Sequence, residues 1–261
     1  MIGVVTGTGT YALPELEDAE PVEVGTRWGK ATVMRGHFGG VPVLHVSRHG
    51  AGHVRLSNHV EHRANVAALR ECGALAVIGC TACGIIDPSL GPGTLVVFDD
   101  LHFPVNRLPD GAPCTLYDRP GEAGRAHWIY DRPYASALRE ALLAGAEAAG
   151  REARDGGVYG HVDGPRFNTV SEIRQLAVAG VTAVSQTAGA ETVLFGEAEI
   201  PYALIGFTTD YANGVAEGTP IAELVELMSA STAIFASVLA EALPRVDLDA
   251  LSPTGTLYRF D

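Results

Sequence analysis

The sequence predicts an α/β fold: a single domain with a mixed central β-sheet flanked by helices. Short apolar, β-branched runs alternate with helix-like stretches along the chain. This alternation is typical of a sheet that is at least partly parallel and covered on both faces. No internal repeat or low-complexity linker divides the 261 residues, and that length suits one large α/β domain.

Each expected element follows from a local pattern. Apolar runs with β-branched residues predict strands at 2–6, 41–46, 75–80, 94–98, 181–185 and 202–208. Helical spacing predicts helices at 58–72, 134–149, 169–179 and 220–242. The third of these helices begins with a capping-box pattern from Thr169 to Glu172.

Three stretches lack a regular pattern. After the first strand, Pro14 and the acidic sequence behind it predict a loop. Residues 104–125 are the longest segment without periodicity, and a loop of that length in a compact domain is usually functional. We expect one domain over 1–243, followed by a C-terminal tail or arm at 244–261.

Composition limits the partners. The chain has 18 basic and 31 acidic residues, a net charge of −13 and no long basic run, so nucleic acid is not an expected partner. An anion would need a local, enclosed cluster of donors. No signal peptide and no apolar run of the ~18 residues that a membrane span needs are visible, so we expect no membrane association and a cytoplasmic location.

The four cysteines offer little for redox or metal chemistry. Cys80 and Cys83 form one C-x-x-C, and the second pair that structural zinc would need is absent from the sequence. Cys80 ends an apolar run, which favours buried free thiols over a redox pair.

The first turn, Gly7-Thr8-Gly9, follows a strand directly. With Ala12 it matches a relaxed dinucleotide fingerprint, which requires a helix to start at the second glycine. Pro14 argues against that helix. A plain tight turn and an anion-binding loop, with Thr8 as hydroxyl donor, therefore stay open beside a dinucleotide site.

Residues 45–63 hold five of the nine histidines. A metal site, an anion site and a histidine-bearing helix face are the competing explanations. His49 and His53 are four apart, but the glycines between them argue against a helix, so the zinc geometry of that spacing fails. We assign His59 and His62 to a solvated helix face.

Arg48 and His49 follow the strand at 41–46 and offer donors that suit an oxyanion. A surface arginine without a role is the alternative. Thr81 and the Ala82 amide follow the next strand, and Thr187 precedes a helix-like stretch, where anions are favoured. Together with Asp210, these strand ends predict one cleft with several oxyanion donors and a single acid.

These motifs resemble those of the trimeric purine nucleoside phosphorylases, in particular the 5′-methylthioadenosine phosphorylase branch. The matching stretches are GTGT at 7–10, SRHGAGH at 47–53, TACG at 81–84, DGPRF at 163–167, SQTAGAE at 185–191 and TTDY at 208–211. The resemblance implies a homotrimer that cleaves a purine nucleoside with phosphate, giving free purine and a pentose 1-phosphate. It implies inorganic phosphate as co-substrate and no metal or organic cofactor.

The resemblance also assigns roles to single residues. It implies Asp210 as the acid that assists departure of the purine, and His127 as a residue that reaches a neighbouring subunit's 5′-pocket. The implied phosphate ligands are Thr8, Arg48, His49, Thr81, the Ala82 amide and Thr187. The implied base and ribose contacts are Phe167, Asn168, Gln186, Asp210 and Ala212.

Base preference is the harder prediction. An Asp at position 210 resembles the enzymes for 6-aminopurines, because a carboxylate accepts from an exocyclic amine. Ala212, Asn168 and Gln186 depart from the usual residues of the branch. We expect 5′-methylthioadenosine or a related 6-aminopurine nucleoside, with 6-oxopurine nucleosides as the alternative. An NAD-binding oxidoreductase and a hydrolytic nucleosidase are further alternatives.

If Arg48 binds phosphate, the variant Arg48→Ala is expected to leave folding nearly intact.

Overall fold

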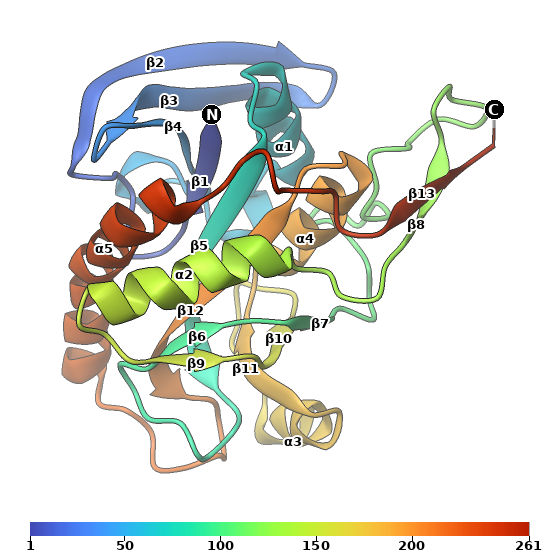
Figure 1. Cartoon of the computed structure of the whole chain (residues 1–261). Coiled ribbons are helices and arrows are strands. Elements are labelled where there is room, and N and C mark those ends of the chain that lie inside the picture. Colours follow the sequence, from blue (N-terminus) through green and yellow to red (C-terminus); the bar gives the residue numbers. More distant parts are fainter. Residues whose placement is uncertain (261) are drawn as a thin grey trace.

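The computed structural model describes residues 1–260 and has a mixed eleven-stranded sheet between two layers of helices, which confirms the predicted fold class (Figure 1). The strands of the sheet are β1 (Ile2–Thr6), β2 (Leu16–Thr26), β3 (Gly29–Phe38), β4 (Val41–Ser47), β5 (Ala76–Ile85), β6 (Leu95–Val97), β7 (Asp100–His102), β9 (Ala153–Asp155), β10 (Val158–His161), β11 (Val181–Ser185) and β12 (Tyr202–Tyr211). The helices are α1 (His62–Glu71), α2 (Ser136–Ala148), α3 (Val170–Val178), α4 (Ala188–Glu197) and α5 (Ile221–Ala242).

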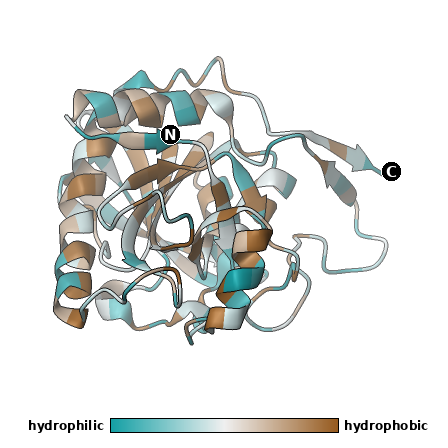
Figure 2. Cartoon of the chain, turned by 90° about the horizontal axis from the view of Figure 1, so that it is seen from below, coloured by the Kyte–Doolittle hydropathy of each residue, from teal (hydrophilic) through white to brown (hydrophobic). Residues whose placement is uncertain are grey.

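Both faces of the central strands are buried. Along β1, Ile2 and Val4 pack in a cluster with α2 and α5, whereas Val5 packs in the cluster that includes α1 and α4. Figure 2 shows these apolar strands in the middle of the molecule, enclosed by the helices. Double-sided burial is the reason that the strands read as continuous apolar runs and not as alternating ones.

The prediction of a loop after Pro14 is wrong. Residues 16–38 instead form β2 and β3, which pair in antiparallel fashion at the edge of the sheet. The charged residues of β2 face solvent, while β3 buries Ala31, Val33 and Phe38 at alternating positions. A charged, exposed edge strand is a common way to prevent sheets from pairing further, but it hides the strand pattern from sequence inspection.

The helix predicted at 58–72 is shorter than expected. A 3₁₀ turn occupies Ser57–His59, Val60 is extended, and α1 starts at His62. The other helices lie close to their predicted bounds. The capping box of α3 is confirmed, because the Thr169 amide donates to Glu172 Oε2 at 2.7 Å and the Glu172 amide donates to Thr169 Oγ1 at 3.4 Å.

Helix α5 is long and apolar enough to cross a membrane by length and composition alone, which the expectation of no such run overlooked. Its C-terminal half buries Phe235, Val238 and Leu239 in the cluster shared with α2. This part of α5 is thus a packed helix of the protein core.

An arm projects from the body of the chain (Figure 1). It is a two-stranded antiparallel sheet of β8 (Ala126–Ile129) and β13 (Thr256–Arg259). Trp128 of β8 packs directly against Gly196 of α4, and its indole N–H donates to the Thr254 carbonyl at 2.5 Å. Residues 244–260 therefore run from the end of α5 to this ribbon, and position 261 lies outside the described residues.

Strands β5 and β12 run further than predicted, and this extension positions the site. The two strands pair in parallel from Val77 to Ile85 of β5, with a bulge in β12 between Thr208 and Asp210. Thr81 and Ala82 therefore lie inside β5 and not behind its end, and Asp210 lies inside β12. The strands continue because each supplies backbone partners for the other.

Candidate active site

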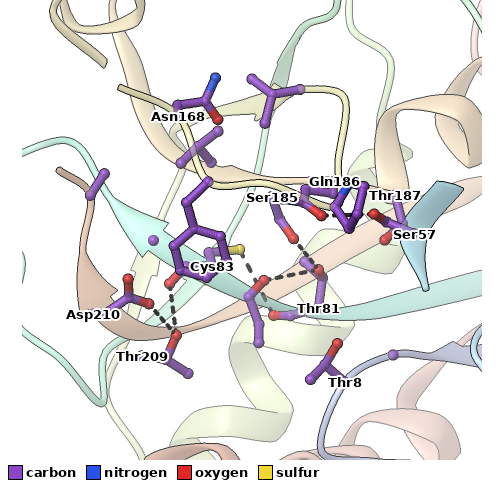
Figure 3. A pocket seen from close by; sticks show the side chains of 18 of the residues that line it. Thr8, Ser57, Thr81, Cys83, Asn168, Ser185, Gln186, Thr187, Thr209 and Asp210 are labelled. Carbon is purple, nitrogen blue, oxygen red and sulfur yellow. Dashed lines mark hydrogen bonds between the residues drawn. The ribbon is translucent and has the colours of Figure 1, made fainter. Parts of the chain in front are cut away.

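A cavity of about 290 Å³ lies over the second halves of β5 and β12. Its walls come from the turn after β1, the segment behind β4, the loop between β10 and α3, and the start of α5. The predicted site residues that line it are Thr8, His49, Thr81, Ala82, Phe167, Asn168, Gln186, Thr187, Asp210 and Ala212 (Figure 3). Arg48 and His127 are not in this lining.

An open edge of β5 forms the floor of one end of the cavity. Strand β1 pairs with β5 only as far as Gly79, and β11 joins the same edge only at Gly84. Amides of odd-numbered residues face β12, as the bond from Val77 N to Pro201 O shows, while the Cys80 carbonyl faces the other edge. Because strand backbone groups alternate in direction, the Ala82 amide also faces this open edge.

Three hydroxyl groups surround the open edge. Thr8 follows β1, Thr81 lies on β5 with its Oγ1 3.3 Å from Ser185 Oγ, and Thr187 precedes α4. Gly9 has a φ of +88°, and a Cβ there would lie 2.5 Å from the Met228 carbonyl of α5. Glycine is therefore required for the turn that presents Thr8.

The start of α4 offers fewer backbone donors than predicted. The Ala188 amide donates to Tyr159 Oη at 3.1 Å, and the Gly189 amide donates to His161 Nδ1 at 3.1 Å. The Thr187 side chain makes no capping bond to the helix. At this position the hydroxyl of Thr187 is hence the group left to bind a ligand, since the first two helix amides are occupied.

His49 is a neutral ring in this structure. Burial, followed by the charge of Arg48, lowers its pKa to about 4, against the opposing bond to the Arg55 carbonyl. That bond, 2.8 Å from Nδ1 to the Arg55 oxygen, requires the proton on Nδ1, because a carbonyl only accepts. Nε2, 3.5 Å from Thr8 Oγ1, is then an acceptor and not the additional donor that we predicted.

Arg48 is a buried residue, only 1% exposed, which excludes a surface arginine without a role. Its guanidinium binds Glu191 through Nε and Nη2, the latter at 2.7 Å from Oε2, and donates from Nη1 to the Cys80 carbonyl at 2.6 Å. Burial opposes the charge, but Glu191 raises the pKa of Arg48 above its ordinary value. The group lies behind Gly7, where a Cβ would come within 2.8 Å of Nη1.

The assignment of His62 to a solvated helix face is wrong. The side chain is buried, with Nδ1 3.8 Å from Glu191 Oε1, and neither ring nitrogen has a hydrogen-bond partner among residues 1–260. Burial lowers its pKa to about 3, so the ring is neutral. The prediction assumed a helix that already runs at 58. The chain before α1 is extended and the helix starts only at His62, so the assumed helical face does not apply to this side chain.

Among residues 1–260, Asp210 is the one carboxylate in the lining of the cavity. Burial raises its pKa, and the hydrogen bond from Thr209 Oγ1 to Oδ1, at 2.7 Å, opposes that shift. The bulge of β12 falls between Thr208 and Asp210 and turns the carboxylate toward the cavity (Figure 3). Its neighbour Cys83 is one of three buried free thiols, which confirms the interpretation of the cysteines.

Among the residues expected near base and sugar, Gln186 lies beside Ser57 and Thr187 and away from Asp210 (Figure 3). Phe167 is 66% exposed and lies at the mouth, and Asn213 Nδ2 donates to the Asn168 carbonyl at 2.7 Å. Gln186 differs from expectation, because both ends of its amide already bind protein groups. Its expected contact with ribose stays a prediction.

His127 lies elsewhere. It is an exposed residue of β8, packed edge-on against Phe260 with ring centroids 5.2 Å apart. It borders a separate hollow of about 620 Å³ beside the arm. A role in the site of a neighbouring subunit stays a prediction.

The sequence analysis missed several lining residues. Leu224 and Met228 of α5 face the cavity, although their helical spacing is typical of core positions, and Ser57, Ser185 and Asn213 also belong to the lining. Ser185 is the first residue of the SQTAGAE motif and Asn213 lies two residues after TTDY, so the motifs could have pointed to these two.

The chain is similar to known proteins in sequence and in structure. The sequence model of the Phosphorylase superfamily matches residues 1–244. The chain is 32% identical to a 6-oxopurine nucleoside phosphorylase of Pyrococcus furiosus, covering 94% of this chain and 92% of that protein. It is 31% identical to an S-methyl-5′-thioadenosine phosphorylase of Chloroflexus aurantiacus, covering 99% and 89%. A methylthioadenosine phosphorylase from Schistosoma mansoni, in complex with adenine, superposes with a TM-score of 0.85 at 25% identity, covering 93% of this chain and 90% of that one.

Proposed function

The chain belongs to the Phosphorylase superfamily, and from this premise we propose that it catalyses the reversible phosphorolysis of a purine nucleoside to free purine and a pentose 1-phosphate. One observation carries the proposal. A single cavity has hydroxyls and a free strand edge at one end and a lone carboxylate, Asp210, at the other. A tetrahedral anion and a purine base need these two kinds of group.

Phosphate would bind at the open edge of β5. The hydroxyls of Thr8, Thr81 and Thr187 and the Ala82 amide are its expected donors, and His49 Nε2 would accept from a protonated phosphate oxygen. Arg48 supplies the enclosed positive charge behind Gly7. Two of its five guanidinium N–H groups are not used by Glu191 and Cys80, which leaves donors for a ligand.

The purine would bind beside Asp210. As the C1′–N9 bond breaks, positive charge develops on the sugar, and the neighbouring phosphate stabilises it before its oxygen bonds to C1′. A protonated Asp210 donates its proton to purine N7, so that the base leaves without a full negative charge. The raised pKa of Asp210 supports this role.

We propose 5′-methylthioadenosine or a related 6-aminopurine nucleoside as substrate. The neutral carboxyl of Asp210 matches such a base, because its O–H donates to N7 while its carbonyl oxygen accepts from the 6-amino group. The 6-oxopurine nucleosides are the second candidate, favoured by the relative from Pyrococcus furiosus and by Ala212 where the branch has a second acid. A homotrimer, in which His127 completes a neighbour's 5′-pocket, is proposed on the family resemblance.

The reaction type is tested by leaving out phosphate. Base release from methylthioadenosine, adenosine, inosine or guanosine is expected to depend on inorganic phosphate and to yield one pentose 1-phosphate per base. Chromatography of the products with and without phosphate measures both quantities. Equal base release in phosphate-free buffer would identify a hydrolase and exclude phosphorolysis.

Thr187→Val is expected to weaken phosphate binding without weakening the fold. A hydrogen bond to a charged ligand is worth about 1.5–3 kcal/mol, so the phosphate KM should rise about tenfold to a hundredfold. The hydroxyl caps no helix amide, so the melting temperature should stay within about 2 °C of wild type. Thr32→Val, at an exposed position of β3, is the matched control with unchanged kinetics. A wild-type phosphate KM in Thr187→Val would remove this residue from the phosphate site.

A further inference from the structure

We propose that Gln186 is a positioning residue, which ties the loop 162–168 to Ser57 and thereby holds Phe167 at the mouth of the cavity. Because this loop would cover the nucleoside, the inference rests on the proposed function. Contact of Gln186 with ribose stays a prediction, and its two hydrogen bonds within the protein indicate a further role.

The two ends of the Gln186 amide bind two separate segments. Ser57 Oγ donates to Oε1 at 2.8 Å, and Nε2 donates to the Arg166 carbonyl at 3.0 Å. Ser57 is 129 positions away in the chain and lies in the 3₁₀ turn before α1. Gln186 therefore bridges the wall of the cavity on one side and the loop on the other.

The backbone of the loop passes directly over this bridge. A Cβ at Gly164 would collide with both Gln186 Oε1 and Ser57 Oγ. Only glycine at this position lets the chain approach the pair so closely. The close approach shows that Ser57, Gln186 and the loop form one packed unit.

Phe167 depends on the loop for its position. Its side chain is 66% exposed, so packing against the body holds it only weakly. On the far side, the Asn168 carbonyl accepts from Asn213 Nδ2 at 2.7 Å. On the near side, the bond from Gln186 to the Arg166 carbonyl ties the loop to the cavity wall, and the Arg166 guanidinium ties it to Glu172 of α3. Loss of the bond from Gln186 would release the ring while the groups at the open edge of β5 stay in place.

The test removes each partner of the bridge. Gln186→Met and Ser57→Ala are each expected to raise the nucleoside KM about threefold to tenfold, since a neutral hydrogen bond contributes about 0.5–1.5 kcal/mol. The phosphate KM should stay within about twofold of wild type, because neither the Gln186 amide nor the Ser57 hydroxyl is among the proposed phosphate ligands. The double variant should be no worse than the worse single variant, because both changes break the same unit. Ser57→Thr, which keeps the hydroxyl, should restore the nucleoside KM.

A control and a second measurement separate this role from general damage. Gln175→Met makes the same substitution at an exposed position of α3 outside the cavity lining, so its nucleoside KM should match wild type. Hydrogen exchange, followed by mass spectrometry, should show faster exchange at 162–168 in Gln186→Met and unchanged exchange at 76–85. Additive effects in the double variant, or an equal rise of both KM values, would overturn the inference. The exchange rates do not depend on turnover. An inactive wild-type protein would therefore contradict the proposed function, while hydrogen exchange would still test the role of Gln186.

Discussion

Asp210→Asn is expected to lower kcat on a 6-aminopurine nucleoside by about 10²–10⁴-fold, the usual contribution of a positioned general acid. Asparagine keeps the size of the side chain and its ability to donate, but it has no proton to transfer to N7. Activity on 6-oxopurine nucleosides should fall less, because an amide N–H can donate to the 6-oxygen. Steady-state kinetics on methylthioadenosine and inosine measure both effects.

The pH dependence of kcat should report the same carboxyl. The protonated form of Asp210 is the active one, and burial raises its pKa, so kcat should fall as the pH rises through that pKa. Thr209→Val removes a hydrogen bond to the charged form, which should raise the pKa further and move the falling limb to higher pH. If the fall of kcat with pH is unchanged in Asp210→Asn and in Thr209→Val, a group other than Asp210 titrates.

Asp110→Asn serves as the matched control, because Asp110 is an exposed residue of the loop 104–125, outside the cavity lining. It should leave kcat and base preference at wild-type values. Wild-type rates and preferences in Asp210→Asn would show that Asp210 takes no part in the reaction.

Arg48→Ala is expected to lower stability by about 3–5 kcal/mol, because it leaves the Glu191 carboxylate buried without its partner. At this chain length such a loss lowers the melting temperature by roughly 10 °C. This expectation replaces the prediction from sequence that the variant folds nearly as well as wild type. Calorimetry or thermal unfolding followed by circular dichroism measures the change.

The same pair allows stability and phosphate binding to be separated. The double variant Arg48→Met with Glu191→Leu replaces the ion pair by apolar groups, which is often neutral for stability. It should melt closer to wild type than Arg48→Ala does, although the Cys80 carbonyl and Tyr202 Oη lose their partners. Its phosphate KM should be at least about tenfold higher than that of wild type, since the free guanidinium N–H donors are gone. A stable double variant with a wild-type phosphate KM would assign Arg48 a purely structural role.

By itself, the sequence determined the features that depend on neighbouring residues. Apolar runs located the central strands, the Thr169–Glu172 box located the start of α3, and Gly7 with Gly9 located the turn that carries Thr8. Periodicity and capping are local properties, since they reflect which face of one element is buried and which backbone groups lack partners. The motifs lie in or next to these elements, and the sheet brings the elements together. Ten of the proposed site residues therefore line one cavity.

Tertiary structure decided the features that join distant segments. Arg48 meets Glu191 across 143 positions, Ser57 meets Gln186 across 129, and the open edge of β5 exists only because β1 ends before β11 joins it. The predictions for His62 and for strand β2 were wrong for the same reason. Segments remote in sequence bury His62, and the position of β2 at the edge of the sheet leaves its charged residues exposed. Contacts between distant segments form only when the intervening chain folds back, and a local sequence pattern does not show which segments will meet.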